Sequence, residues 1–327
     1  MATKKDVFFT WDGIGDNLVL LGAAYNYFRL VGKKPLIASD LPFVNYSDYS
    51  IPVKNLSLQK ISTEYRKTMK NMNSLGLNPI FITAADYKYL LPDNKKCITT
   101  WSSKHMITRY CEKMGLDGEI DISIPLSIGQ TATLSTINTP YICVMCGGIQ
   151  KYKSVKPEVM QRVSDFLSSK VLVVQLGSKA DPPLKNVVDK KNCTLIEAYN
   201  LLKGALFFVG AVGGLIHLAR AANCKSVVLQ TTGEPECLTK YEGNILVKPI
   251  DICDLCAKNI IDPQHQECFF GYKCINNITS EMIIQEIDEN WTYLISETKK
   301  ISRYEISYAD KAEGLEDYYH ISNIVTP

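Results

Sequence analysis

The sequence predicts an α/β protein built on parallel sheets, and two stretches of the chain carry this prediction. Residues 206–212 form an apolar run short enough to be a buried strand, and a glycine turn follows them. Leu215, Leu218 and Ala219 then recur at helical spacing, before a second apolar run at residues 226–229. Residues 7–11 begin a similar strand, glycine loop and helix near the N-terminus. Such units place parallel strands in one sheet, and ligands bind outside the carboxyl ends of those strands.

The first 135 residues alternate between strand and helix patterns. We expect strands at residues 7–11, 34–40, 51–53, 79–83 and 97–101, and helices at residues 18–30, 59–73 and 103–114. A polar stretch at residues 127–140, rich in Ser and Thr and ending in Asn-Thr-Pro, has the composition of a linker. The sequence therefore predicts a first α/β domain at residues 1–135.

A second domain at residues 136–290 is predicted from the same alternation. Strands are expected at residues 141–146, 171–175, 206–211 and 226–230, and helices at residues 157–167, 194–202, 215–222 and 279–299. Pro157 suits the first position of its helix, and Thr279 suits an N-cap. Residues 291–327 are expected to be the end of the last helix and a tail.

Composition excludes several classes of protein. The chain of 327 residues is 46% hydrophobic and 21% charged, which is ordinary for a globular protein, and its net charge of +2 gives no sign of a nucleic-acid partner. No apolar run reaches the length of a membrane span, and the N-terminus has no apolar signal segment. Eleven cysteines without such a signal indicate reduced thiols, so we expect a cytoplasmic protein. Peripheral membrane contact and oligomerisation stay open.

The two glycine loops have different chemistry. Gly213, Gly214 and Leu215 begin a helix, where unpaired backbone N–H groups suit a phosphate-bearing small molecule. The first loop contains Gly13 and Gly15, but Leu18 stands where a dinucleotide fingerprint has its third glycine. A dehydrogenase is therefore disfavoured.

The Gly-x-x-His-Leu-Ala motif that contains His217, with the Gly-Asp pair of the first loop, resembles the ADP-heptose glycosyltransferases of family 9. The resemblance implies the GT-B architecture, two Rossmann-like domains facing a cleft. It also implies an inverting, metal-independent transfer of a sugar, possibly a heptose, from a nucleotide diphosphate to a glycan or protein hydroxyl, with an ADP-sugar favoured. The family usually has an acidic residue where this chain has Val212.

The resemblance assigns roles to two charged positions. Asp16 would be the general base that deprotonates the acceptor hydroxyl, although its position also fits a helix cap. The family has a lysine before a helix-starting proline that faces the donor phosphates. Lys153 is the first choice for that role and Lys151 the second.

The remaining donor-site residues are expected on loops that face the same ligand. Glu197 would reach the nucleoside ribose, unless it is a solvated helix carboxylate. The full donor-binding set comprises Gly15, Lys151, Glu197, Gly213, Gly214, Leu215, His217, Thr231, Thr232 and Gly233.

Four cysteines have the spacing of a structural metal site. They are a close pair, Cys253 and Cys256, followed by Cys268 and Cys274. Some family relatives carry a comparable cysteine finger that holds iron, and spacing alone does not separate zinc from iron. Buried reduced thiols are the alternative.

Two other functions remain compatible with the sequence. A nucleotide-sugar 2-epimerase shares the two-domain architecture but needs no acceptor. A non-catalytic protein that binds a nucleotide sugar, or a scaffold, is compatible with the missing acidic residue at Val212.

Overall fold

The computed structural model describes ten segments of the chain: residues 4–11, 13–53, 61–83, 85–90, 97–101, 104–128, 137–147, 153–230, 238–250 and 272–296. Residues 1–296 form one compact unit, and residues 297–327, which form the second unit, lie outside the described residues. The predicted domain boundaries at residues 135 and 290 remain a proposal, but the chain does fold around two separate parallel sheets.

The first sheet is parallel, with the strand order β3-β2-β1-β4. Its strands are β1 (Lys5–Phe9), β2 (Leu36–Ile37), β3 (Ile51–Pro52) and β4 (Leu77–Phe81). The accompanying helices are α1 (Ile14–Val31), α2 (Ile61–Ser74), α3 (Met106–Lys113) and a short 3-10 helix (Pro42–Tyr46). These elements confirm the pattern expected for this half of the chain.

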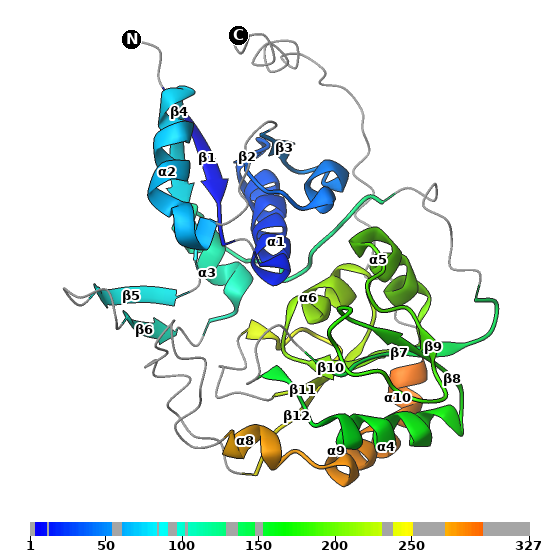
Figure 1. Ribbon diagram of the computed structural model, residues 1–327. Helices are drawn as coiled ribbons and strands as arrows, with labels where there is room; N and C mark the ends of the chain where they lie inside the picture. Colours follow the sequence, from blue (N-terminus) through cyan, green and yellow to red (C-terminus); the bar gives the residue numbers. More distant parts are fainter. Residues whose placement is uncertain are drawn as a thin grey trace. The chain divides into compact units, whose positions relative to one another are not determined.

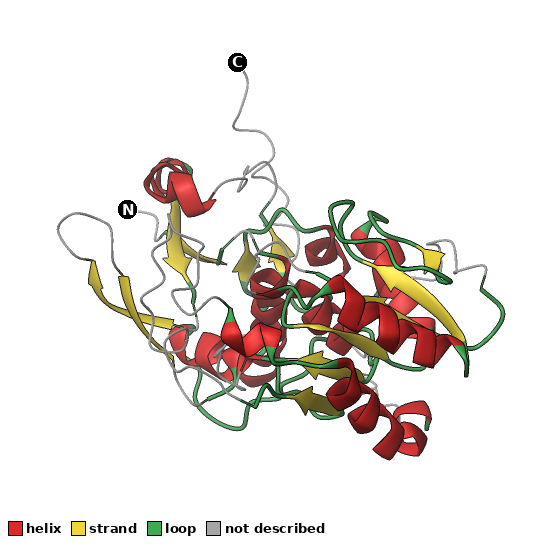
Figure 2. Cartoon of the chain, turned by 60° about the horizontal axis from the view of Figure 1, so that its bottom comes forward, coloured by secondary structure: helices red, strands yellow, loops and turns green. Residues whose placement is uncertain are grey.

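A separate antiparallel pair joins β5 (Ala85–Leu90) to β6 (Cys97–Trp101). The strand at residues 97–101 was predicted, but its pairing with β5 was not. In both views the pair extends to one side, apart from the parallel strands (Figures 1 and 2).

Helix α1 packs closely against α3. A Cβ atom on Gly22 would lie 2.9 Å from Cδ1 of Ile107 and 2.9 Å from the carbonyl oxygen of Ser123, so only glycine fits there. One turn later, the buried amide of Asn26 donates to the Asp121 carbonyl and accepts from the Asp121 N–H. These contacts fix α1, whose N-terminus enters the site, on the chain that follows α3.

The second sheet has six parallel strands in the order β12-β11-β10-β7-β8-β9. They are β7 (Tyr141–Met145), β8 (Leu172–Leu176), β9 (Val188–Asp189), β10 (Phe208–Ala211), β11 (Ser226–Leu229) and β12 (Asn244–Val247). Numbered from β7, this is the doubly wound order 3-2-1-4-5-6. Its direction reverses between β7 and β10, where such sheets bind ligands.

Helices cover both faces of the second sheet (Figure 1). On one face lie α4 (Pro157–Ser168) and α9 (Ser280–Glu289), and on the other lie α5 (Leu195–Gly204) and α6 (Gly214–Ala221). Alternate residues of β7 belong to different cores: Val144 packs with α4 and α9, whereas Met145 packs with α5 and α6. The core that contains Met145 continues into α1 and α3, so apolar packing joins the two sheets' helices.

The predicted starts of two helices are confirmed. Pro157 is the first residue of α4, and the Thr279 hydroxyl accepts a hydrogen bond from the Met282 N–H at the start of α9 (3.3 Å). The helix predicted over residues 279–299 is divided at Asn290 into α9 and α10 (Trp291–Ile295). A short helix, α8 (Lys273–Asn276), precedes them. Among the described residues, no helix is both long enough and apolar enough to span a bilayer.

Candidate functional site

A cavity of about 590 Å³ lies where both sheets present the loops that follow their strands. The loop after β1 contributes Gly13, the first turn of α1 contributes Gly15 and Asp16, and the loop after β10 contributes Val212 and Gly213. Gly147 follows β7, and Gly177, Ser178 and Asp181 follow β8. Lys153, which precedes α4, and Ala198 of α5 complete the wall. Its position matches the point where the second sheet reverses its strand order, the usual ligand site of such sheets.

Asp16 lies in the first turn of α1 and is not its N-cap residue. The N-cap residue is Gly13, which has no side chain, and Asp16 is the third helical residue. Its Oδ1 accepts a hydrogen bond from the Tyr110 hydroxyl of α3 (3.1 Å), and that hydroxyl also lies 3.0 Å from Oγ1 of Thr10. A tyrosine from a distant helix therefore orients this carboxylate. Sequence gave no signal for Tyr110, because the pairing spans 94 residues.

The two glycines at the start of α6 have different surroundings. A Cβ atom on Gly214 would lie 2.9 Å from Cβ of Ile14 and 3.3 Å from the Gly15 nitrogen, so this glycine lets the first turns of α6 and α1 touch. Around Gly213, a Cβ atom would meet only the Ala211 oxygen at 3.9 Å. Both glycines, which belong to the expected donor-binding set, line the cavity, and Gly214 in addition lets the other helix approach. Both helix N-termini face the cavity, and their partial positive charges favour an anion there.

His217 is buried on α6 and reaches across to α1. Its Nδ1 lies 2.6 Å from the Tyr241 hydroxyl. The opposite edge of the ring faces Gly15, where a Cβ atom would lie 2.7 Å from Cδ2 and 3.2 Å from Nε2. Burial, followed by the charges of His105 and Lys153, lowers the pKa of His217 to about 3. His217 is therefore a neutral imidazole near pH 7.

Lys153 lines the cavity, as expected for a residue that faces donor phosphates. Its charge acts on His217, which indicates that the ammonium is near the start of α6. The second choice, Lys151, lies outside the described residues, as do Thr231, Thr232 and Gly233. The roles of these four residues remain predictions.

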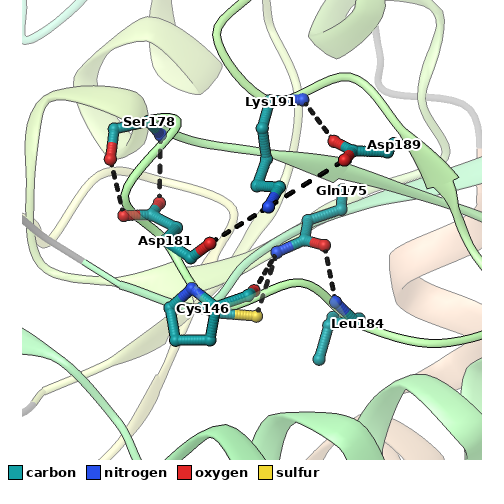
Figure 3. Close-up of polar contacts among 8 residues, drawn as sticks. Cys146, Gln175, Ser178, Asp181, Leu184, Asp189 and Lys191 are labelled. Atoms are coloured by element: carbon teal, nitrogen blue, oxygen red, sulfur yellow. Dashed lines mark hydrogen bonds and ion pairs between the residues drawn. The ribbon is translucent and has the colours of Figure 1, made fainter.

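Asp181 enters the cavity from the loop that follows β8 (Figure 3). Its side chain accepts two hydrogen bonds from Ser178, one from the hydroxyl (2.8 Å) and one from the backbone N–H (3.1 Å). Two glycines make room for this carboxylate. A Cβ atom would lie 2.1 Å from it on Gly177, whose φ of +134° also favours glycine, and 3.0 Å from it on Gly147. Sequence analysis missed Asp181; the available signal was an acidic residue shortly after Gly177 at the end of a strand.

The loop that carries Asp181 is anchored to the sheet by Gln175, which is fully buried in β8 (Figure 3). The Gln175 amide donates to the Pro182 carbonyl (2.7 Å), and its oxygen accepts from the Leu184 N–H (2.9 Å). Lys191 adds a hydrogen bond from Nζ to the Asp181 carbonyl (3.0 Å). The loop that carries the Asp181 side chain is therefore anchored at Asp181 itself and at Pro182 and Leu184, which follow it.

Glu197 lies at the exposed start of α5, where it completes a capping box with Thr194. Its carboxylate accepts from the Thr194 N–H (2.7 Å) and hydroxyl (2.8 Å), and these bonds lower its pKa. Glu197 is not among the residues that line the cavity. Its position does not support the predicted contact with a ribose. Asp181, in contrast, is an acidic residue that does line the cavity.

Three members of the cysteine cluster, Cys253, Cys256 and Cys268, lie outside the described residues. The fourth, Cys274, is buried in α8. Within the described segments, no three His, Cys, Asp or Glu side chains are grouped closely enough to hold a metal ion. The metal site therefore remains a prediction.

Comparison with known proteins gives relatives in structure only. No protein-family model matches the chain, and no curated protein matches it in sequence. Among solved structures, the chain is similar to the iron-containing dodecameric glycosyltransferase TibC of enterotoxigenic E. coli, with a TM-score of 0.64, 16% identity, and coverage of 90% of this chain and 78% of TibC.

Two further structures match almost over their whole length. A family 9 glycosyl transferase from Veillonella parvula aligns with a TM-score of 0.61 and 14% identity, covering 88% of this chain and 98% of that one. The E. coli ADP-heptose lipopolysaccharide heptosyltransferase II aligns with a TM-score of 0.57 and 13% identity, covering 87% and 98%. The resemblance seen in the sequence is thus confirmed at the level of architecture. The chain has the GT-B fold that is found in the heptosyltransferases and in a family 9 glycosyltransferase.

Proposed function

We propose that the protein transfers a sugar from a nucleotide diphosphate donor to an acceptor hydroxyl, with inversion at the anomeric carbon. The observation that carries this proposal is the junction of Asp16 with the starts of α1 and α6 in one cavity. A carboxylate and a site for an anion are the two parts that such a transfer needs. The fold supports the same reaction, because two similar structures were solved with ADP-heptose or its 2-deoxy-2-fluoro analogue.

In this proposal Asp16 acts as the general base. It accepts the proton of the acceptor hydroxyl while the oxygen attacks the anomeric carbon, and the bond to the diphosphate breaks on the opposite side. Tyr110 holds the carboxylate toward the cavity by its hydrogen bond. General-base catalysis of this kind contributes about 10²–10⁴-fold to the rate.

The second sheet would bind the donor. The diphosphate gains negative charge as it leaves, and the N–H groups at the start of α6 together with Lys153 are placed to stabilise that charge. Asp181 follows the second strand of the doubly wound order, where an acidic side chain commonly accepts hydrogen bonds from a ribose. We assign the nucleoside to that end of the cavity and the sugar to the end near Asp16.

The donor would differ from the usual heptose at the position of Val212. This side chain is buried and lines the cavity, but it offers no hydrogen bond to a sugar hydroxyl. A charged acceptor in its place would contribute about 1.5–3 kcal/mol per hydrogen bond. We therefore favour a changed donor sugar on an ADP carrier, with a glycan or protein as acceptor.

The cysteine cluster is proposed to hold a structural zinc or iron ion. Four thiolates suit either metal and leave no coordination position open for a substrate. Cys274 supplies one thiol from α8. Metal analysis of the purified protein tests this proposal: one bound ion per chain that is lost in Cys253→Ser supports it, and a metal-free wild-type protein contradicts it.

A donor screen followed by product analysis tests the main proposal. ADP-, GDP-, UDP- and CDP-sugars are compared by thermal shift, because a ligand at 100 times its Kd stabilises the native state by about 2.7 kcal/mol. The donor found is then incubated with the protein, with and without candidate acceptors. Nucleotide release coupled to a new glycoside supports transfer, whereas an epimeric sugar formed without acceptor contradicts it.

A further inference from the structure

The two edges of the His217 ring face different surroundings. Nδ1 contacts the Tyr241 hydroxyl, and the edge that carries Nε2 faces Gly15 beside the cavity. A neutral imidazole carries one proton, so the partner of Nδ1 decides whether Nε2 donates or accepts. The chemistry that His217 offers to a ligand therefore depends on Tyr241.

The surroundings of Tyr241 decide the direction of that hydrogen bond. Tyr241 is 2% exposed, and its hydroxyl has a single hydrogen-bond partner among the described residues, Nδ1 of His217. If Nδ1 were the donor, the phenol proton would be buried without an acceptor, which is costly. Burial raises the pKa of Tyr241, so the phenol keeps its proton. The hydroxyl accordingly donates, and Nδ1 accepts.

Two side chains, those of His105 and Arg220, pack against the Tyr241 ring. The ring of His105, the N-cap of α3, lies edge-on at 4.7 Å between centroids, and the guanidinium of Arg220 lies 5.6 Å from the Tyr241 ring centre. His105 precedes α3, which packs on α1, whereas Arg220 belongs to α6 on the second sheet. Residues that precede α3 and that belong to α6 thus both contact this one phenol.

We propose that Tyr241 is a positioning residue that holds His217 as its Nε2–H tautomer, so that His217 donates a hydrogen bond to an oxygen of an anionic ligand in the cavity that the starts of α1 and α6 line. The part of the proposal that concerns a ligand rests on the proposed function, with the diphosphate of the donor as the anion. The tautomer itself is a property of the protein without ligand. His217 acts here as a neutral donor beside Lys153, not as an acid or a cation.

Nitrogen NMR of the ligand-free protein, labelled at histidine, tests the tautomer directly. We expect the Nδ1 signal of His217, assigned by loss in His217→Gln, at the shift of an unprotonated nitrogen and its Nε2 signal at that of a protonated one. In Tyr241→Phe, which removes only the hydroxyl, both signals should move toward the average of the two tautomers. A proton on Nδ1 in the wild type, or signals unchanged in Tyr241→Phe, would overturn the proposal.

Tyr141→Phe is the matched control. Tyr141 is equally buried, and its hydroxyl donates to the Leu201 carbonyl (2.8 Å), so the loss of a buried phenol bond is reproduced away from His217. It should leave the His217 signals in place. Should Tyr241→Phe fail to fold, the wild-type spectrum still decides the tautomer.

Binding of ADP and of inorganic pyrophosphate tests the role toward the ligand. We expect Tyr241→Phe to weaken both about tenfold, Tyr141→Phe to leave both unchanged, and His217→Gln, whose amide also places a donor near Nε2, to bind more tightly than His217→Leu. Equal affinities of wild type and Tyr241→Phe would refute the positioning role. If the wild type binds neither probe, the proposed donor site fails, while the tautomer is still judged by NMR.

Discussion

The two walls of the cavity are built from the same strand–loop–helix unit, yet they carry different chemistry. The wall from the first sheet brings one carboxylate, Asp16, that a tyrosine orients. The wall from the second sheet brings a lysine, a neutral histidine and the anchored Asp181. Its strands also complete the six-stranded doubly wound order, while the first sheet has four strands. In the proposed function this difference is a division of labour, with the donor held by the second wall and the base supplied by the first.

Removing the charge of Asp16 should have the largest effect. We expect Asp16→Asn to lower turnover of the donor by about 10²–10⁴-fold, because the amide cannot accept the acceptor's proton. Nucleotide release under saturating donor is the measurement. Asp6→Asn, which changes an exposed carboxylate on β1 bonded to Asn78, is the control and should keep full turnover. Wild-type turnover in Asp16→Asn would remove Asp16 as the base.

Acid should destabilise the protein through the histidines that link the two walls. Burial is the main reason that the pKa of His217 is lowered to about 3, and burial together with the Arg220 charge lowers the pKa of His105 to about 4. Below pH 6.5 the unfolded chain binds protons that the folded chain does not. Each histidine therefore lowers the free energy of unfolding by up to about 1.4 kcal/mol per pH unit, until pH falls to its folded pKa.

Urea unfolding of wild type and His217→Gln between pH 7.5 and 4 measures this dependence. We expect the stability of the variant to fall less steeply with acid, because glutamine does not titrate. Parallel slopes for the two proteins would show that His217 is not held neutral.

Contact between the first turns of α1 and α6 predicts unequal effects at adjacent glycines. Gly214→Ala places a methyl group 2.9 Å from Ile14 and should destabilise the protein by about 1–3 kcal/mol, the usual range for overpacking. Gly213→Ala is the matched control, because its φ of 172° is open to any residue and the nearest atom is 3.9 Å away. Thermal unfolding with equal losses in both variants would contradict this packing.

Asp181 should affect the nucleoside end of the ligand and not the phosphates. We expect Asp181→Asn to weaken ADP binding about tenfold, because a charged hydrogen-bond acceptor is lost, and to leave pyrophosphate binding unchanged. Asp288→Asn alters an exposed carboxylate on α9 that pairs with Lys170, away from this loop, and serves as the control. If the binding of pyrophosphate weakens as much as that of ADP, the assignment of the nucleoside to this end of the cavity is wrong.

The smallest effect is expected at Val212. We predict that Val212→Asp gives no gain with ADP-heptose and weakens the native donor slightly, because a carboxylate would stand near the diphosphate. Turnover with both donors is compared in wild type and variant. A clear gain with ADP-heptose would show that the family's donor was retained.

Local sequence patterns predicted most of the fold, because apolar periodicity and glycine turns are local signals. They located both glycine loops, the parallel strands that carry them and the start of α4 at Pro157. The predicted strand at residues 97–101 formed, but its partner β5 was not recognised among polar residues.

Long-range contacts could not be predicted in the same way. Tyr110 reaches Asp16 across 94 residues, and Tyr241 reaches His217 across 24, so no local spacing reveals either pair. The reason for Gly214 was also hidden, because its neighbour Ile14 comes from the other sheet's first helix. The sequence left a ribose contact and a helix carboxylate open for Glu197, because a capping box and a ribose contact require the same residue type.

Calorimetric titration of ADP into wild type and Asp16→Asn tests the division of labour most directly. We predict one site per chain with the same Kd in both proteins, even though Asp16→Asn turns over the donor far more slowly than the wild type. Loss of ADP binding in Asp16→Asn, or no binding of ADP to the wild type, would contradict it.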